Sequence, residues 1–446
     1  MRISAIAFVT CLAAATFARG QVFDRITEAY RPYLDAHDPL SLDLKLKSLS
    51  SSPYTFWRGS KDLFYTWAKT ECADWLSERD QRVTIHGDLH LGNIGTYATD
   101  FQQLAFGLVD FDDSTTLPFQ IELLQGMISL DLAREQNKLD LTDEQRREID
   151  DALLTAYRRG LTSGQNATEV LAGEPMVAKL LAKTKKPYDS EIKQYVADDR
   201  FKPFVGKAEK PKEILRPLDE ATLDAFAAGL AAAAGGDAAL AARLKVHDAT
   251  ALRQSIIAGA SRTRLGSSGS QGQRKYLFLL RGALADQPGD VLLYLKEQIP
   301  TSAQRAGVAP PDDASPSERW VRDATRLTAP PMFLCAAVTV SGRSFAMTLK
   351  EPWSDELSSD DAVDFESLKA LAGVWGTVAG RAHGKGVDPA KLTPALAADL
   401  RQRADAYVAR QAADFAAFVA DERVKAAAQR VSDAVQAATR SQSNAQ

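Results

Sequence analysis

The stretches HGDLHLGN, residues 86–93, and VDFDD, residues 109–113, decide the fold that we expect for this chain. Transfer of a phosphoryl group needs a carboxylate that orients or accepts the proton of a hydroxyl. It also needs an amide oxygen and a second carboxylate that hold Mg²⁺ against the phosphates. Asp88 and Asn93 stand five residues apart, and Asp110 follows Asn93 by 17 residues, after a predicted hairpin. The base, the amide and the second carboxylate that phosphoryl transfer needs thus lie in these two stretches, in an order that predicts a phosphoryl-transfer site.

The two motifs together resemble those of the aminoglycoside phosphotransferase and choline kinase branch of the kinase-like fold. That branch carries His-Gly-Asp-Leu-His-x-x-Asn and then an apolar-Asp-aromatic-acidic motif, and this sequence has both in that order. The resemblance implies that Asp88 is the catalytic base and that Asn93 and Asp110 are metal ligands. The residues expected to support them are His86, His90 and Asp112.

A metal-dependent hydrolase is an alternative interpretation of the first motif. His86, Asp88 and His90 alternate, so in an extended strand their side chains would share one face and could bind Zn²⁺. Such an enzyme needs more ligands, and only His247 and His383 remain after residue 40. This interpretation also leaves the second motif unexplained. A polar loop that merely caps a strand would leave both motifs unexplained.

A second chemical signal lies far downstream, in RLGSSGSQG, residues 264–272. Its glycines recur at every third residue before two predicted strands, residues 276–280 and 291–295. A glycine-rich turn between strands lets backbone N–H groups approach phosphates, and a lysine on a nearby strand can pair with them. We therefore expect nucleotide contacts from Gly266, Ser267, Ser268, Gly269, Gly272 and Lys296.

The order of these signals predicts a circularly permuted, two-lobed α+β fold of the protein-kinase-like type. In ordinary kinases the glycine loop and the lysine precede the catalytic loop, whereas here they follow it. Residues 21–85 have helical patterns and cannot supply the missing strands. We therefore expect a helical lobe with the catalytic and metal loops over residues 21–249, a β-rich nucleotide lobe over residues 250–350, and the rest of the helical lobe over residues 351–446. Glu351-Pro352-Trp353 would be the hinge.

Local patterns add detail to this plan. Residues 62–79 have a helical periodicity that would bury Cys72. Lys183–Pro217 is rich in Lys and Pro, which predicts a long irregular connection. Asp219 should begin an alanine-rich helix, and Ser341-Gly342 should join two strands in a hairpin.

The chain as a whole resembles a bacterial family named domain of unknown function 2252. The resemblance runs from near Lys45 to near Phe418, and it implies a kinase-like domain without naming a substrate. Besides the two motifs, its landmarks are Phe56-Trp57-Arg58-Gly59, Gly266-Ser267-Ser268-Gly269, Leu295-Lys296-Glu297 and Ala379-Gly380-Arg381-Ala382-His383.

Three residues have more than one interpretation. Arg58 could touch a phosphate or an acidic substrate, or it could pair with a buried carboxylate. His383 ends a predicted helix, where a cation often only stabilises the helix end, so we leave it outside the catalytic set. Glu318, on a predicted helix over residues 317–327, is either the partner of Lys296 or an ordinary exposed helix residue.

Composition narrows the partners and the location. The chain has 446 residues with 54 Lys+Arg and 58 Asp+Glu, so it lacks the basic excess of a nucleic-acid-binding protein. Residues 1–20 contain a charge, an apolar run and small residues in signal-peptide order, which predicts export to the periplasm or the exterior. No later segment approaches the ~20 apolar residues that a membrane-spanning helix needs. Cleavage would leave Cys72 and Cys335, and their different lobes make a disulfide between them unexpected.

The sequence therefore predicts a phosphotransferase that uses Mg²⁺ and ATP or another nucleotide. The transferred group would be a phosphoryl or nucleotidyl group, and the acceptor a small molecule or a protein. An exported, non-catalytic pseudokinase that binds a nucleotide or another ligand is the second interpretation, because the periplasm holds little ATP. The acceptor and the oligomeric state are left open.

Overall fold

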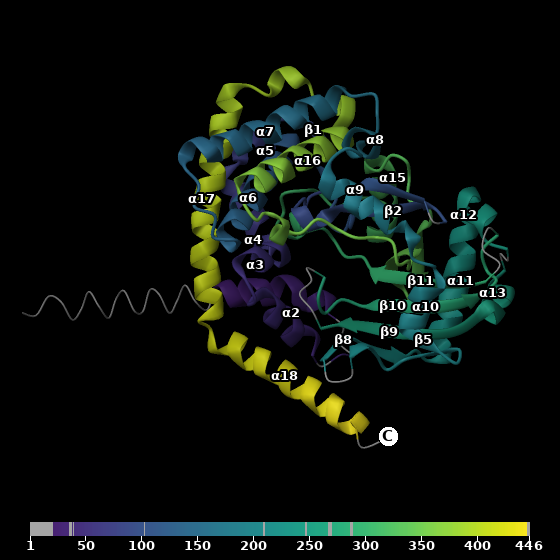
Figure 1. The fold of residues 1–446 in the computed structure, drawn as a ribbon. Coiled ribbons are helices and arrows are strands. Elements are labelled where there is room, and N and C mark those ends of the chain that lie inside the picture. The colour runs from purple at the N-terminus through teal and green to yellow at the C-terminus, as the bar shows by residue number, and fades with distance from the viewer. Residues whose placement is uncertain are drawn as a thin grey trace, which may run out of the picture.

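The computed structural model shows a helical part beside a part built on a large sheet (Figure 1). The described residues are 21–34, 38, 40–101, 103–207, 210–245, 248–265, 270–285 and 289–443. The predicted signal peptide, residues 1–20, lies outside them, as do Gly266, Ser267, Ser268 and Gly269 of the predicted glycine turn. The expected α+β class is confirmed.

The large sheet has seven antiparallel strands with an apolar core on each face. Their spatial order is β12 (Cys335–Val340), β13 (Arg343–Leu349), β11 (Asp290–Glu297), β10 (Lys275–Arg281), β9 (Ile256–Arg264), β8 (Lys210–Pro217) and β7 (Phe204–Lys207). On one face, Phe278 of β10 stacks on Phe226 of α11 (Glu220–Gly236), with 3.8 Å between the ring centroids. The other helices of this part are α10 (Asp189–Tyr195), α12 (Ala238–Arg243), α13 (Ala249–Ser255), α14 (Ser302–Arg305) and α15 (Pro316–Leu327).

The helical part surrounds two small sheets that carry the sequence motifs. One sheet pairs β1 (Arg82–Ile85) with β4 (Thr115–Pro118), and the other pairs β2 (Ile94–Asp100) with β3 (Gln103–Leu108). The helices are residues 21–30, α2 (Ser41–Leu49), α3 (Pro53–Gly59), α4 (Lys61–Glu71), α5 (Ala73–Ser77), α6 (Phe119–Gln136), α7 (Asp143–Thr162), α8 (Ala167–Leu171), α9 (Pro175–Leu181), α16 (Phe365–His383), α17 (Pro394–Val419) and α18 (Glu422–Ser443). Among the described residues, none of the helices combines the length and apolar character needed to cross a membrane.

Helices α7 and α16 approach each other closely through glycines. A Cβ added at Gly376 would lie 2.2 Å from the carbonyl oxygen of Leu153, and one added at Gly380 would lie 2.2 Å from that of Tyr157. Any larger residue would therefore force the two helices apart. This contact places the C-terminal end of α16 next to the first motif.

Several local predictions are confirmed. The hairpin between the two motifs is β2–β3, and Asp219 caps α11 by accepting a hydrogen bond from the Thr222 N–H. Ser341 and Gly342, with φ of 50° and 73°, form the turn between β12 and β13. Positive φ at both central residues suits the right-handed twist of a two-residue hairpin.

One local prediction is wrong, and another is confirmed in part. Lys183–Pro217 is not an irregular connection, because it holds α10, the short pair β5 (Val196–Ala197) and β6 (Arg200–Phe201), and strands β7 and β8. The large sheet therefore begins at Phe204, well before residue 250. The helix predicted over residues 62–79 is divided at Cys72 into α4 and α5, although the Cys72 side chain is fully buried as expected.

The segment after β13 joins the sheet to the helical part, as expected of Glu351-Pro352-Trp353. It runs beside β2, where Thr96 N–H donates to Asp355 O at 2.8 Å and Leu357 N–H donates to Ile94 O at 2.8 Å. The Trp353 indole is fully buried and donates to Lys186 O at 2.7 Å. The connection is therefore anchored on both sides.

Candidate active site

Hydrogen bonds tie the first motif to the second. The Asn93 side chain donates from Nδ2 to Asp88 O at 2.8 Å, and Val109 N–H donates to Asn93 O at 3.0 Å. His86 Nε2 lies 2.9 Å from Val109 O. Gly87 has a φ of 79°, and a Cβ there would lie 2.0 Å from Asp113 O, so only glycine fits. The two motifs thus form one compact unit.

Arg58 supports this unit from α3 through a contact with His90 of the first motif. Arg58 Nε donates to His90 Nε2 at 2.9 Å. Burial, with the charges of Arg58 and Lys61, holds the pKa of His90 well below its ordinary value, so the ring is neutral and can accept this bond. Arg58 therefore has a histidine partner here, instead of the buried carboxylate considered from sequence, and its guanidinium also lines a small cavity beside Asp88.

Asp88 lines this cavity and is paired with a lysine that the sequence analysis missed. Lys61 Nζ on α4 is 2.9 Å from Asp88 Oδ1, and the two side chains are 1% and 16% exposed. Lys61 also packs over the Trp57 ring, 3.2 Å from its centroid. Burial raises the pKa of Asp88 to about 6, with Lys61 opposing the shift and Asp113 adding to it. Burial thus makes Asp88 easier to protonate than an ordinary aspartate.

Lys296 brings the sheet to the second motif. Its Nζ is 2.6 Å from both Asp110 Oδ1 and Asp112 Oδ2, and Gln298 Nε2 donates to Asp112 Oδ1 at 3.0 Å. Burial raises the pKa of Asp112, and the charge of Asp110 raises it further. Burial alone would raise the pKa of Asp110 too, but Lys296 lowers it overall. The residues of two distant motifs thus meet at one point.

Helix α15 holds the second motif through Arg319, another residue that the sequence analysis missed. The Arg319 guanidinium is buried and donates to Asp112 O at 2.7 Å and to Ser114 O at 2.8 Å. Glu318 is not the partner of Lys296. Its carboxylate instead accepts a bond from Ser315 N–H at 2.8 Å in a capping box at the exposed start of α15.

Glu122 of α6, which the sequence analysis missed, holds the first motif, and His383 of α16 lies beside it. The buried Glu122 carboxylate accepts bonds from His86 N–H and from Gly87 N–H, the latter at 3.1 Å. His383 Nε2 is 3.6 Å from Glu122, and His383 Nδ1 shares a 2.7 Å hydrogen bond with Tyr157 Oη. His383 thus contacts Glu122 and Tyr157, and it is not among the residues that line the small cavity beside Asp88.

Two cavities meet at Asp110. The smaller, of about 50 Å³, is lined by Tyr30, Arg58, Asp88, Asp110, Asp112, Asp113, Ser270, Gln273, Ile299 and Arg305. The larger, of about 300 Å³, extends between the sheet and the joining segment and includes Lys275, Tyr294, Lys296, Trp320, Glu351 and Glu356. Because Asp110 lines both cavities, a ligand in the larger cavity that contacts Asp110 would lie next to the smaller cavity, which Asp88 lines.

The donor atoms fit Mg²⁺ better than Zn²⁺. Mg²⁺ is held by one or two carboxylates together with substrate phosphates, and Asp110 lies beside Asn93, whose Oδ1 is not used by the Nδ2 bond. His86 and His90 are held within the loop, and no three His, Cys, Asp or Glu side chains in the described part are arranged to hold a metal. The structure thus offers the hydrolase interpretation no zinc centre within those residues.

The comparisons place the chain in a family. Residues 37–433 match the family model described as "Uncharacterized protein conserved in bacteria (DUF2252)". The chain belongs to this family. No curated protein and no solved structure matches it. The family match covers both motifs, the large sheet and the first half of α18, so it includes every residue of the site just described except Tyr30.

Among the predicted glycine-turn residues, Gly272 is the member that the structure describes. It has a φ of 83°, and a Cβ there would lie 2.5 Å from Ser41 O of α2. Glycine is therefore required because the turn between β9 and β10 packs against the helical part. The nucleotide contacts expected from Gly266, Ser267, Ser268 and Gly269 stay predictions.

Proposed function

We propose that this member of the family is a Mg²⁺- and nucleotide-dependent phosphotransferase with a circularly permuted kinase-like fold. The observation that carries the proposal is the meeting of Lys296 with Asp110 and Asp112, each at 2.6 Å, beside the loop that bears Asp88 and Asn93. Phosphoryl transfer relies on positioning and on charge stabilisation, and these are the side chains that it requires.

The order of elements in the large sheet supports a kinase-like nucleotide lobe. The predicted glycine turn joins β9 to β10, Lys296 lies on the next strand, β11, and α15 follows before β12 and β13. In protein kinases the phosphate lysine likewise lies on the third strand of the lobe, which is the second strand after the glycine-rich loop. The helix departs from that pattern, because α15 contacts the second motif through Arg319 and offers no glutamate to Lys296.

Each residue has a role that follows from its contacts. Asp88, with a pKa raised to about 6, is mostly ionised at neutral pH and can accept the proton of an acceptor hydroxyl. Lys61 holds that carboxylate in place. Asn93 and Asp110 would hold Mg²⁺, which supplies neutralisation of phosphate charge. Lys296 would exchange one of its carboxylate partners for a nucleotide phosphate.

Transfer of label from nucleotide tests this proposal. Wild-type protein, Asp88→Asn and the control Asp151→Asn, an exposed position on α7, would be incubated with Mg²⁺ and ATP labelled at the α or the γ phosphate in the presence of hydroxyl and amine acceptors. We expect labelled product with the wild type and the control and at least ~10²-fold less with Asp88→Asn, while its nucleotide binding persists. Unchanged turnover in Asp88→Asn would contradict the role of Asp88. Binding without turnover in the wild type would favour the pseudokinase interpretation.

A further inference from the structure

The sheet face that carries Lys296 also carries two cations that belong to neither motif. In the register of the sheet, Lys275 of β10 lies directly opposite Lys296 of β11. Tyr276 lies opposite Ser261, which puts Arg262 of β9 beside Lys275. Paired residues of adjacent strands point to the same face, and adjacent strands lie ~4.8 Å apart. Arg262, Lys275 and Lys296 therefore form a row across three strands, which we call the cation row.

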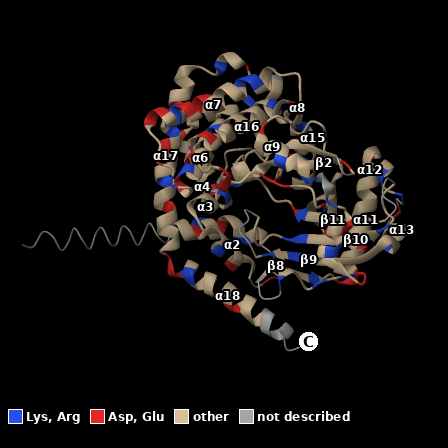
Figure 2. Ribbon diagram, viewed as in Figure 1, with Lys and Arg blue, Asp and Glu red and all other residues tan. Residues whose placement is uncertain are grey.

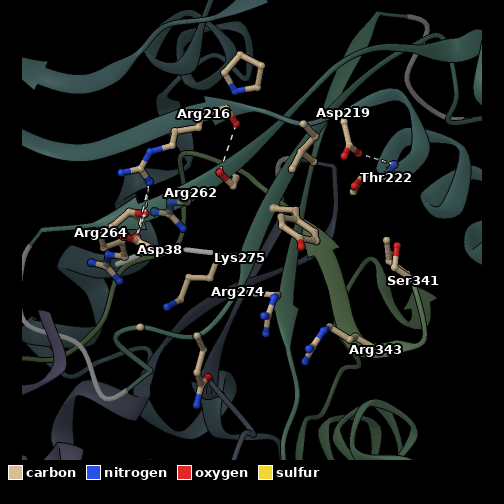
Figure 3. A pocket seen from close by; sticks show the side chains of 18 of the residues that line it. Asp38, Arg216, Asp219, Thr222, Arg262, Arg264, Arg274, Lys275, Ser341 and Arg343 are labelled. Carbon is tan, nitrogen blue, oxygen red and sulfur yellow. Dashed lines mark hydrogen bonds and ion pairs between the residues drawn. The ribbon is translucent and has the colours of Figure 1, made fainter. Parts of the chain in front are cut away.

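The pictures agree with this register. Figure 2 shows Lys and Arg positions at the ends of β9, β10 and β11 that lie toward the helical part. In Figure 3, Arg262, Arg264 and Lys275 gather on one side of these strands, whereas Arg274 and Arg343 lie on the other. All three members of the cation row line the cavity of about 300 Å³ beside Asp110.

The two outer members of the row already have carboxylate partners. Arg262 donates from Nε and Nη2 to both oxygens of Glu213, at 2.6 and 2.5 Å. Lys296 pairs with Asp110 and Asp112. Both outer cations are thus balanced by protein charge.

The middle member, Lys275, differs from its neighbours. It is 4% exposed, and its Nζ donates to the carbonyl oxygen of Ser270. Within the described part of the chain, no carboxylate lies at ion-pair distance from Lys275. Burial, and then the charges of Lys296 and Arg262, hold its pKa well below the ordinary value. A buried ammonium group between two cations is costly unless an anion accompanies it.

An anion can reach Lys275 because two cavities open onto it. The cavity of about 300 Å³ beside Asp110 is lined by Arg262, Arg264, Lys275 and Lys296. The cavity of about 480 Å³ shown in Figure 3 is lined by Arg262, Arg264 and Lys275 as well. Cavities of this size suit small molecules. Arg262 and Lys275 therefore lie where the two spaces meet, and Lys296 lines the smaller of them.

We infer that the row formed by Arg262, Lys275 and Lys296 binds the polyphosphate chain of a ligand, with two or more phosphates laid across β9, β10 and β11. The inference rests on the proposed function and extends it, because it assigns contacts with the phosphate chain to Arg262 and Lys275, which belong to neither motif. A monophosphate would reach only part of the row. Affinity should therefore rise with the number of phosphates, and Lys275 should matter most for the longer chains.

Calorimetric titration of Lys275→Met tests the inference. The ligands are inorganic tripolyphosphate, ATP and AMP, each with Mg²⁺, and the control is Arg281→Met, which removes a 60% exposed cation at the far end of β10. A charge-assisted hydrogen bond contributes ~1.5–3 kcal/mol to binding. Lys275→Met should therefore lower the affinity for tripolyphosphate and for ATP by roughly 10- to 100-fold. Lys275→Arg should retain most of the affinity, and AMP binding should change little.

The outcomes separate this inference from the proposed function. Because Lys275 is a buried cation without a carboxylate, Lys275→Met should melt no lower than the wild type, which checks that it folds. Equal tripolyphosphate affinity in folded Lys275→Met would overturn the inference while Mg²⁺-ATP turnover by the wild type would still support the proposed function. Weaker tripolyphosphate binding in Lys275→Met than in the wild type, together with no turnover by the wild type, would support the cation row and count against the proposed function. Absence of binding of both tripolyphosphate and ATP to the wild type would overturn both.

Discussion

Replacing Lys61 by methionine should raise the pKa of Asp88 and make stability depend on pH. The substitution removes the cation 2.9 Å from the Asp88 carboxylate, in a pair that is 1% and 16% exposed. A cation this close lowers a carboxyl pKa by ~1–3 units, so its loss should move the pKa of Asp88 from about 6 to ~7–9. Each pKa unit corresponds to ~1.4 kcal/mol. When Asp88 is ionised, the free energy of unfolding of Lys61→Met should therefore be lower than that of the wild type by an additional ~1.4–4 kcal/mol.

The sign of the pH effect follows from linkage. A raised pKa means that the folded state holds a proton more tightly than the unfolded state, in which Asp88 titrates at its ordinary ~3.9. The added loss is therefore complete above the raised pKa of ~7–9, and it disappears as the pH falls below about 6, where Asp88 is protonated in both proteins. Wild type and Lys61→Met should accordingly differ more at pH 9 than at pH 5.

Urea unfolding at several pH values measures this difference. The double variant Lys61→Met/Asp88→Asn should lose the extra pH dependence, because no carboxylate is left to titrate. Lys69→Met, an exposed lysine on the same helix, should stay within ~0.5 kcal/mol of the wild type. A loss in Lys61→Met that is the same at pH 5 and pH 9 would refute the coupling of Lys61 to Asp88.

Two further predictions concern packing in the helical part. Cys72 is fully buried, and burial raises its pKa to about 11. A thiol reagent at pH 8 should therefore not modify Cys72 until urea unfolds the protein. Rapid reaction of Cys72 in the native protein, detected by peptide mass mapping, would contradict this burial. Gly126→Ala would place a Cβ 2.6 Å from the Trp375 ring, and overpacking of this kind costs ~1–3 kcal/mol in the free energy of unfolding. Gly173→Ala meets nothing within 4 Å and serves as the control, so equal stability of the two variants would show that α6 and α16 do not pack as described.

The site residues that can be predicted from the sequence are those that lie close to one another along the chain. Asp88, Asn93 and Asp110 lie on one loop and one hairpin, so their spacing along the chain largely determines their spacing in space. Lys296 was placed by the strand pattern that precedes it. These short-range patterns do not depend on knowing how distant helices pack.

The residues that the sequence analysis missed come from helices whose partners lie far along the chain. Lys61 looks like an ordinary polar helix position until α4 packs beside the first motif, and Arg319 looks the same until α15 covers the second. Glu318 is different, because Ser315 three residues earlier is the signature of a capping box and could have identified its role. Strand β8 was missed because Lys and Pro residues mask the apolar pair at its centre.

The measurement that tests the central claim most directly is a thermal-shift titration with ATP. It is carried out with and without Mg²⁺, on the wild type and on Asp110→Asn. The account predicts that millimolar Mg²⁺-ATP raises the melting temperature of the wild type, since a ligand that binds only the folded state stabilises it. The shift should shrink without Mg²⁺, because Asp110 then has no metal to hold against the phosphates. It should also shrink in Asp110→Asn, because the carboxylate that would hold the metal and that pairs with Lys296 is replaced. No shift of the wild type at millimolar Mg²⁺-ATP would contradict the claim that this cluster binds a nucleotide.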